Sequence, residues 1–569
     1  MFKLRRFLKH YKKELILGPF FKLLEAIFEL AVPLVMAQII DKGIGNNDSD
    51  YVWKMSGLIV VLGICGLGFA LTCQFFAAKC AYGFGTELRD ALYKHINKFS
   101  HAEIDRFGTS SLITRITNDT VLAQNGVNMF IRLAVRAPFL IVGAAVMSMT
   151  LDLKLSIIFL IAAPIITLII VWVMKKTVPM YKKIQKGLDK ISLLTRENLD
   201  GVRVIRAFSK QEEEKKELIN ESGRLSDNAV IAGKISAILN PVTFMIMNLG
   251  IVAILWFGGI RVDTGYLTQG EITAFVNYMT QILLALVVLA NLVIIFTKAA
   301  SSASRINEVF DTQPSMTDGS DTKFDFSSPA VEFENVSFSY PDAGDLSLNN
   351  ISFTLKKGEI LGIIGGTGSG KSTLANLVPR FYDITSGNIK IFGKDIKKYS
   401  MEELRNLIGI VPQRAALFSG TIADNMRWGK PDATDQEIIS ALKIAQAWEF
   451  VSKLTDGIKT NISQGGKNLS GGQRQRLTIA RALVGNPPVV ILDDSMSALD
   501  YATDLALRKA IESELKYTAV IMISQRATTL QNANHILVLD NGEAAGYGIH
   551  ETLLKNCEEY AEIYKSQMS

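Results

Sequence analysis

Residues 358–373, GEILGIIGGTGSGKST, join an apolar, strand-like run to a glycine-rich turn and a Lys-Ser pair. Glycines let backbone N–H groups close around phosphate oxygens, and the N-terminus of a following helix favours negative charge. We expect Lys371 to reach the β- and γ-phosphates of a nucleotide, and the Ser372 hydroxyl to bind Mg²⁺. The pattern therefore predicts an ATP site whose loop is Gly365, Gly366, Thr367, Gly368, Ser369, Gly370, Lys371, Ser372 and Thr373.

A second apolar run, PPVVILDD, ends in two adjacent carboxylates, Asp493 and Asp494. The run is typical of a buried strand, and we expect it to deliver Asp493 to the Mg²⁺ ion. A site that hydrolyses ATP also needs a group that holds the attacking water, usually the longer glutamate. The short side chain of Asp494 at that place predicts a slow reaction.

The phosphate loop and the carboxylates belong to an α/β pattern that runs to the end of the sequence. It begins with the alternating apolar residues of VEFENVSFSY, residues 331–340. A polar segment rich in Ser and Asp, residues 312–328, precedes it and is typical of a linker. We predict an α/β nucleotide-binding domain of the P-loop type over residues 329–569.

The first half of the chain has a different residue pattern. Its apolar runs are long enough to cross a bilayer, which takes roughly 20 residues. Lys and Arg gather in the polar connections near 83–127 and 176–239, which places these connections and the N-terminus in the cytoplasm. We predict an all-α transmembrane domain over residues 1–311. Its six spans lie near 15–40, 56–82, 128–150, 153–175, 240–261 and 272–298.

Composition and charge limit the classes of function to consider. The 569 residues have a mean hydropathy of +0.22 and a net charge of +6, with acids scattered among the bases. This distribution does not indicate a nucleic-acid partner. The spacing of the four cysteines predicts neither a disulfide framework nor a zinc site.

Between the two ATP motifs lies NLSGGQRQR, residues 468–476. With this stretch the chain resembles the ATP-binding-cassette (ABC) proteins, whose signature is LSGGQ. Six spans followed by one cassette resemble a half-transporter of the ABC exporters. The resemblance implies the type I exporter fold, ATP and Mg²⁺ as cofactors, a second half-transporter as partner, and a multi-pass protein of a bacterial plasma membrane. It also implies export of hydrophobic or amphipathic compounds, such as drugs, lipids or peptides.

The resemblance assigns further site residues. Tyr340 matches the aromatic residue that stacks on adenine, and Gln413 matches the glutamine that contacts Mg²⁺. The signature residues, which would close the partner's ATP site, are Leu469, Ser470, Gly471, Gly472 and Gln473. The loop that would touch the opposite cassette is Ser497, Ala498, Leu499 and Asp500.

Two positions depart from the family pattern. Asp494 stands where hydrolytic ABC sites have glutamate, and Gln525 stands where they have a switch histidine. Removing one methylene withdraws the carboxylate by about 1.5 Å, and misplacement on this scale can cost roughly 10²-fold in rate. Gln525 cannot become cationic near the γ-phosphate. Both changes fall on one reaction, so the chain resembles the degenerate-site subunit of bacterial heterodimeric, multidrug-type exporters.

Three arrangements are consistent with these departures. In an asymmetric heterodimer, this chain binds ATP at a slow site and lends its signature to the partner's active site. In a homodimer, both sites are slow. In a regulatory subunit, ATP binding gates a channel or a partner with little transport.

Two cytoplasmic stretches resemble the coupling helices with which exporter membrane domains contact the cassettes. They are Arg115–Gln124 and Glu197–Phe208.

The sequence says little of the substrate. Glu25 and Glu29 lie four residues apart in the first span, where buried acids are costly and usually face a cavity or a cation. One hypothesis is that they attract cationic amphiphiles, and the alternative is a local ion pair with Lys22. Asp41, at the outer end of the span, is a candidate gate residue or a simple surface charge.

Overall fold

The computed structural model describes residues 2–341 and 343–568, and its chain forms two compact units. The first unit is Met1–Asn97 with Ser110–Thr312. The second is Gln313–Ser569 together with Lys98–Thr109, a short piece from the first half of the sequence.

Among the described residues, six helical segments are long and apolar enough to cross a membrane. This confirms the predicted all-α membrane domain. The segments are Lys3–Ile44, Ser49–Ile96, Thr109–Leu151, Ile157–Asp200, Gln211–Asp263 and Gln269–Asp311.

Three of these segments consist of several elements, and the other three are single helices. The first contains η1 (Phe2–Tyr11), α1 (Lys12–Gln38) and η2 (Ile39–Ile44), and the second is α2 (Ser49–Ile96). The third follows α3 (His101–Phe107) and contains α4 (Thr109–Thr114), η3 (Arg115–Asp119), α5 (Thr120–Met129), η4 (Phe130–Ala134) and α6 (Arg136–Leu151). The others are α7 (Ile157–Asp200), α9 (Gln211–Ala237) with α10 (Leu239–Asp263), and α11 (Gln269–Asp311).

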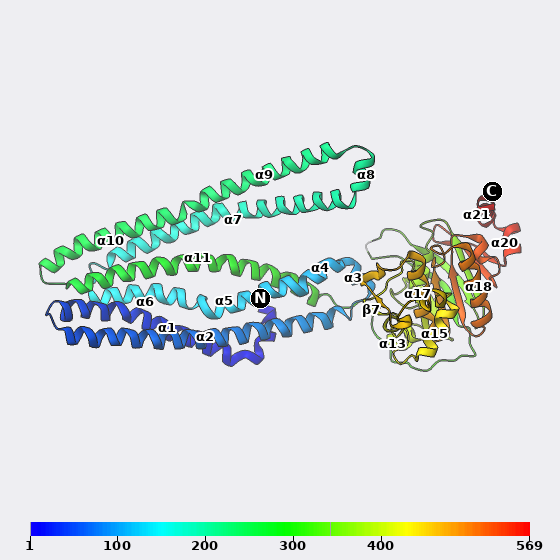
Figure 1. Ribbon diagram of the computed structural model, residues 1–569, viewed down its shortest axis with the longest axis horizontal. Helices are drawn as coiled ribbons and strands as arrows, with labels where there is room; N and C mark the ends of the chain where they lie inside the picture. The colour runs from blue at the N-terminus through cyan, green and yellow to red at the C-terminus, as the bar shows by residue number, and fades with distance from the viewer. Residues whose placement is uncertain (1, 342, 569) are drawn as a thin grey trace. The chain divides into compact units, whose positions relative to one another are not determined.

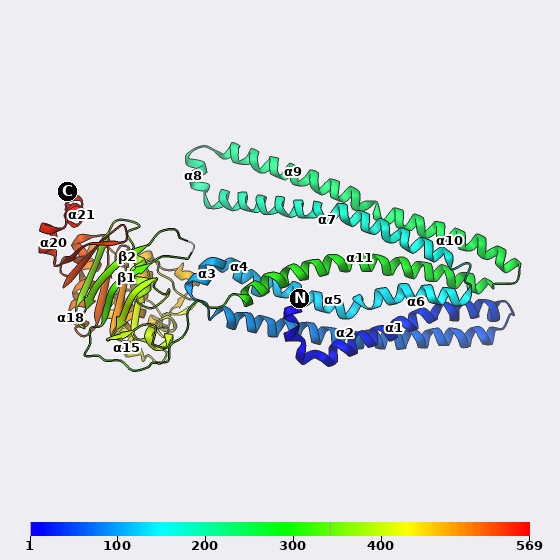
Figure 2. The same ribbon diagram turned by 180° about the vertical axis from the view of Figure 1, so that it is seen from behind.

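Helices α7 and α9 continue well beyond the length that a bilayer requires, roughly 20 residues. They run side by side, and the short α8 (Val202–Ala207) joins their ends (Figures 1 and 2). No residue of α8 is buried. The polar connection 176–239 is therefore mostly helical.

The core of the first unit lies along α11, whose buried face includes Phe275, Tyr278 and Met279. Tyr278 is fully buried, and its hydroxyl donates a hydrogen bond to the carbonyl oxygen of Leu30 at 2.8 Å. In a membrane the hydroxyl needs such a partner, because lipid offers none. The bond ties α11 to α1.

The described part of the second unit contains a six-stranded sheet in the order β12-β11-β3-β10-β9-β6. The pairs of β3 with β10 and β11, and of β9 with β10 and β6, are parallel. Such strands are apolar throughout because helices cover both faces. The strands are β3 (Ile360–Gly365), β6 (Ile408–Val411), β9 (Val489–Asp493), β10 (Ala519–Ile523), β11 (His535–Asp540) and β12 (Glu543–Gly548).

A smaller antiparallel sheet, in the order β2-β1-β4-β5, packs its apolar side chains into a second core with β3. Its strands are β1 (Val331–Phe338), β2 (Leu348–Leu355), β4 (Ser386–Ile391) and β5 (Lys394–Asp395), and a further pair is β7 (Gly420–Thr421) with β8 (Asn461–Ile462). The main helices are α12 (Lys371–Leu377), α13 (Met401–Asn406), α14 (Ile422–Met426), α15 (Asp435–Ile444), α16 (Trp448–Val451), α17 (Gly471–Leu483), α18 (Tyr501–Glu514), α19 (Ala527–Leu530), α20 (His550–Asn556) and α21 (Glu558–Met568). The predicted α/β class is confirmed.

Candidate nucleotide site

A cavity of about 690 Å³ opens at the carboxyl ends of β3, β9 and β10, where ligands of parallel sheets usually bind. The sequence-predicted residues that line it come from five separate parts of the chain. They are Tyr340, Thr367, Gly368, Gly370, Lys371, Ser372, Thr373, Gln413, Asp493, Asp494 and Gln525.

The phosphate loop joins β3 to α12 through backbone that only glycine fits. A Cβ on Gly365 would lie 2.0 Å from the carbonyl oxygen of Leu539. Gly370 has φ +99°, and a Cβ there would lie 2.8 Å from the carbonyl oxygen of Ser347. The Lys371 ammonium group donates hydrogen bonds to the carbonyl oxygen of Gly365 at 3.0 Å and to the Ser369 hydroxyl at 3.3 Å. The loop is thus held around this cation.

The three predicted magnesium ligands, Ser372, Gln413 and Asp493, line the same cavity. The Ser372 hydroxyl donates to Asp493 Oδ1 at 3.1 Å. Burial raises the pKa of Asp493, with a further rise from the neighbouring charge of Asp494, while the Ser372 hydrogen bond and Lys371 lower it. These oxygen donors fit Mg²⁺, which takes few protein ligands and keeps sites for phosphate and water. When bound, the ion would neutralise phosphate charge.

Asp494 lies just beyond β9 in a left-handed conformation, with φ +45°. Its backbone N–H donates to the carbonyl oxygen of Ile523 at 3.0 Å, which fixes it beside β10. Burial raises the pKa of the Asp494 carboxyl, and a hydrogen bond from the Gln413 side chain and the charge of Lys371 lower it. The carboxylate therefore lies in the cavity, next to the magnesium ligands and close to the phosphate-loop lysine.

Gln525 follows β10 and lines the same cavity, with an exposed side chain. Its carbonyl oxygen accepts a hydrogen bond from the Gln567 side chain of α21 at 2.7 Å. The two positions that depart from the family pattern thus face one cavity.

Tyr340 follows β1 at the edge of the cavity. Its hydroxyl and that of Thr373 form a hydrogen bond of 3.1 Å, and its ring packs edge-on against Tyr382, with centroids 5.2 Å apart. The exposed part of the ring faces the cavity, where an adenine ring could stack on it.

Several lining residues were not predicted from the sequence. Asn541 and Gly542 come from the turn between β11 and β12, and Asp345 and Ser347 from the loop before β2. The Asn-Gly pair predicts a tight turn, but nothing in its spacing relates it to the phosphate loop.

The signature residues do not line this cavity. Ser470 begins α17 with reciprocal hydrogen bonds to Gln473, a capping box. Gly472 faces the predicted dimer loop, since a Cβ on it would lie 3.4 Å from the carbonyl oxygen of Ala498. Asp500 ends that loop by capping α18. The two segments are therefore neighbours, away from their own chain's cavity.

Helix α3 contacts the nucleotide-binding fold. The Tyr382 hydroxyl donates to Asp105 Oδ2 at 2.6 Å, and the His101 ring stacks on Phe381 with centroids 4.4 Å apart. Burial lowers the pKa of His101, and so does the nearby charge of Arg405. Since Tyr382 also packs on Tyr340, α3 is one aromatic ring away from the cavity wall.

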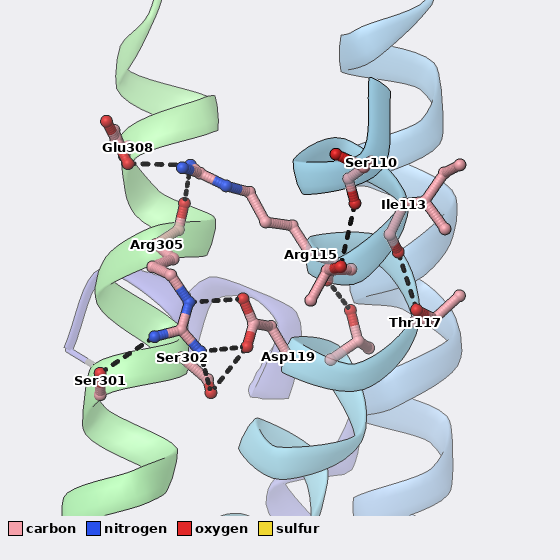
Figure 3. Close-up of polar contacts among 11 residues, drawn as sticks. Ser110, Ile113, Arg115, Thr117, Asp119, Ser301, Ser302, Arg305 and Glu308 are labelled. Carbon is pink, nitrogen blue, oxygen red and sulfur yellow. Dashed lines mark hydrogen bonds and ion pairs between the residues drawn. The ribbon is translucent and has the colours of Figure 1, made fainter. Parts of the chain in front are cut away.

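The stretch Arg115–Gln124, one of the two expected coupling stretches, packs on α11 (Figure 3). Asp119 is fully buried; it accepts hydrogen bonds from Ser302 at 3.0 Å and from Arg305 Nε at 2.8 Å. Arg115 pairs with Glu308 at 2.9 Å. A buried carboxylate needs such partners, so these polar residues join helices. For this stretch, as for Glu197–Phe208, the other expected coupling stretch, contact with the cassette stays a prediction.

The candidate substrate residues all have partners. Glu25 pairs with Lys22 at 2.6 Å, the local arrangement that the sequence left open, whereas Glu29 pairs with Arg136 at 2.6 Å. Asp41 accepts hydrogen bonds from the Thr268 hydroxyl at 2.6 Å and from the Gly270 N–H at 2.8 Å. It therefore ties the end of the first segment to the start of α11.

Comparisons with known proteins agree with this geometry. Residues 15–287 match the family model for the ABC transporter transmembrane region, and residues 348–497 match the model for the ABC transporter. The chain is 38% identical over 567 residues to the uncharacterized ABC transporter ATP-binding protein YfiB of Bacillus subtilis, covering 100% of this chain and 98% of that protein.

It is also 32% identical to the ATP-dependent lipid A-core flippase of Haemophilus influenzae, covering 99% of this chain and 96% of that protein. The structure of a bacterial Atm1-family ABC exporter with ATP bound shares its fold, with a TM-score of 0.82 over 98% of this chain and 99% of that one, at 24% identity. A membrane region and an ATPase domain in one chain define an exporter half-transporter. The chain belongs to the ABC transporter family and is a multi-pass membrane protein of the exporter type.

Proposed function

We propose that this chain is the slow-site half of a heterodimeric exporter of amphipathic compounds. Residues 1–311 form its transmembrane domain, 312–328 its linker and 329–569 its cytoplasmic ATPase domain. The observation that carries the proposal is the pairing of an intact nucleotide cavity with Asp494 and Gln525 at its reacting end. The chain keeps the residues that bind ATP and lacks the glutamate and histidine that allow fast hydrolysis.

Binding is assigned to groups that the cavity gathers. Tyr340 takes the adenine ring, Lys371 the phosphates, and Ser372, Gln413 and Asp493 the Mg²⁺ ion. The Asp494 side chain is one methylene shorter than the glutamate that would hold the attacking water. The Gln525 amide can donate a hydrogen bond but carries no charge. ATP bound here stabilises the closed pair of cassettes.

The partner completes the arrangement. Leu469–Gln473 lie outside their own chain's cavity, which leaves them available to the ATP held by a second cassette. Hydrolysis at that second site, with its own Glu and His, reopens the pair and resets the membrane helices from outward-facing to inward-facing.

The test compares ATPase rates of the purified full chain. We expect wild type alone to be slow, and Asp494→Glu with Gln525→His to raise the rate by roughly 10²-fold. Lys371→Ala in the restored variant should abolish the gain, which ties it to this cavity. A fast wild type would contradict the proposal and support a homodimer whose sites work with aspartate. A restored variant no faster than a slow wild type would contradict the role given to Asp494 and Gln525.

A further inference from the structure

A second cavity, of about 120 Å³, lies inside the membrane unit between α1, η4, α6 and α11. Its polar wall is Glu29, Arg136 and Gln281, and its apolar wall includes Leu133, Leu140 and Leu284. At about 30 Å³ per water, the volume suits a headgroup rather than a whole amphiphile. We name it the Arg136 cavity.

The polar wall is incompletely bonded. Arg136 Nη2 donates to Glu29 Oε2 at 2.6 Å, and Gln281 Nε2 donates to the carbonyl oxygen of Glu29 at 3.4 Å. Arg136 Nε and Gln281 Oε1 are buried and have no hydrogen-bond partner among the described residues. A buried donor or acceptor without a hydrogen bond costs free energy, so both atoms indicate a place for a further polar group.

The charged residues of the cavity wall are one cation, Arg136, and one anion, Glu29. Glu29 is matched by Arg136, and Glu25 by Lys22. The unbonded Arg136 Nε can only donate, which favours an acceptor group in the cavity, and the planar guanidinium suits phosphate or carboxylate oxygens.

We propose that the Arg136 cavity binds the anionic headgroup of the transported amphiphile, with Arg136 as the principal contact. This deepens the proposed export function and rests on it. The headgroup oxygens accept from Arg136 Nε, a headgroup hydroxyl donates to Gln281 Oε1, and the tail lies along the apolar wall, where Leu284 is 58% exposed. Glu29 limits affinity by competing for the same guanidinium, which allows release.

Because Glu29 and the anion compete for Arg136, changes at the two residues should alter anion affinity in opposite directions. Glu29→Gln frees Arg136 and should tighten anion binding, whereas Arg136→Gln should weaken it about tenfold, the effect of losing one charge-assisted hydrogen bond. An ion pair with a purely structural role predicts that both changes act alike. Arg136→Lys keeps the charge and should fall between wild type and Arg136→Gln. It also keeps the test open if Arg136→Gln does not fold.

A matched control is available in the same unit. Arg261 and Asp152 form another ion pair among the membrane helices and do not line this cavity. Arg261→Gln should lower the melting temperature without changing anion binding.

The probes are three fluorescent amphiphiles with the same tail, carrying a phosphate monoester, a choline phosphate or a trimethylammonium headgroup. Their binding to the purified full chain in neutral detergent is measured by anisotropy without ATP. We expect the phosphate monoester to bind at least about tenfold more tightly than the cation. Excess inorganic phosphate should not displace it, because the tail supplies part of the affinity. Displacement by inorganic phosphate would indicate a free-anion site and overturn the amphiphile assignment.

Tighter binding of the cation would overturn the proposal and favour the cationic hypothesis for Glu25 and Glu29. Parallel losses in Glu29→Gln and Arg136→Gln would overturn it in favour of a structural pair. Because binding is read without hydrolysis, these outcomes are independent of the ATPase test of Asp494.

Discussion

At the scale of single residues, the nucleotide site places two carboxylates side by side at a cost in stability. Burial raises the pKa of Asp493 and that of Asp494, and the charge of Asp494 raises the pKa of Asp493 further. A raised pKa means that the folded protein binds protons more readily than the unfolded chain, so stability falls as pH rises through this range. The arrangement suits a cation site, where binding later relieves the cost.

Asp494→Asn should therefore stabilise the nucleotide-free protein at neutral pH. A change on the order of 1 kcal/mol corresponds to a rise of about 2–4 °C in melting temperature for a domain of this size. The gain should shrink as pH is lowered through the raised pKa toward the ordinary value of 3.8, because wild type then becomes neutral there too. Asp432→Asn, at an exposed position outside the cavity, serves as the control in thermal unfolding of the full chain. A gain that does not vary with pH would contradict this account.

At the scale of elements, α3 lies between two membrane segments in the sequence but packs with the nucleotide-binding fold. Asp105 accepts from Tyr382, which packs on Tyr340 at the cavity wall. Since α3 directly follows α2 and precedes α4, we expect a shift of the aromatic rings on nucleotide binding to affect both of these membrane segments.

Tyr382→Phe removes the hydroxyl and keeps the ring. We expect ATPase activity of the assembled transporter to be nearly unchanged, while transport falls about tenfold, the effect of one hydrogen bond to a charged group. Tyr399→Phe is the matched control, because its buried hydroxyl donates to the Ile391 carbonyl oxygen at 2.8 Å, away from α3. Measuring ATPase and efflux in the same vesicles separates coupling from catalysis. Equal losses of both activities in Tyr382→Phe would indicate a structural role only.

Elements encoded locally could be predicted from the sequence, and contacts between distant segments could not. Membrane helices follow from long apolar runs, and the phosphate loop follows from glycine spacing, because both signals lie within one stretch of chain. By contrast, Glu29 and Arg136 are 107 residues apart, and no pattern relates them. Helix α3 was missed for the same reason. The capping box of Ser100 and Glu103 predicts that a helix begins there, but not that it contacts aromatic residues nearly 280 positions away.

At the scale of the whole molecule, the two ATP-related parts of this chain are expected to serve different sites. The phosphate loop and Asp494 line one cavity, while the signature stands apart from it beside Ala498 and Leu499. If the chain works with a competent partner, damage to its signature should harm hydrolysis more than damage to its own phosphate loop.

A substitution at Gly471 tests whether the signature of this chain matters more for hydrolysis than its own phosphate loop. A Cβ on it would have no atom within 4 Å, so Gly471→Asp leaves the chain's own packing undisturbed, and acidic residues are favoured in the first turn of a helix. The new carboxylate would nevertheless repel the phosphates of a nucleotide held by the partner. In the co-expressed pair we expect ATP hydrolysis to fall by roughly 10²-fold or more, whereas Lys371→Ala in this chain should reduce it only severalfold. Gly223→Asp, on α9 and equally open, should have no effect. If Lys371→Ala proved as damaging as Gly471→Asp, both sites would hydrolyse ATP, and the division of labour between two unlike chains would have to be abandoned.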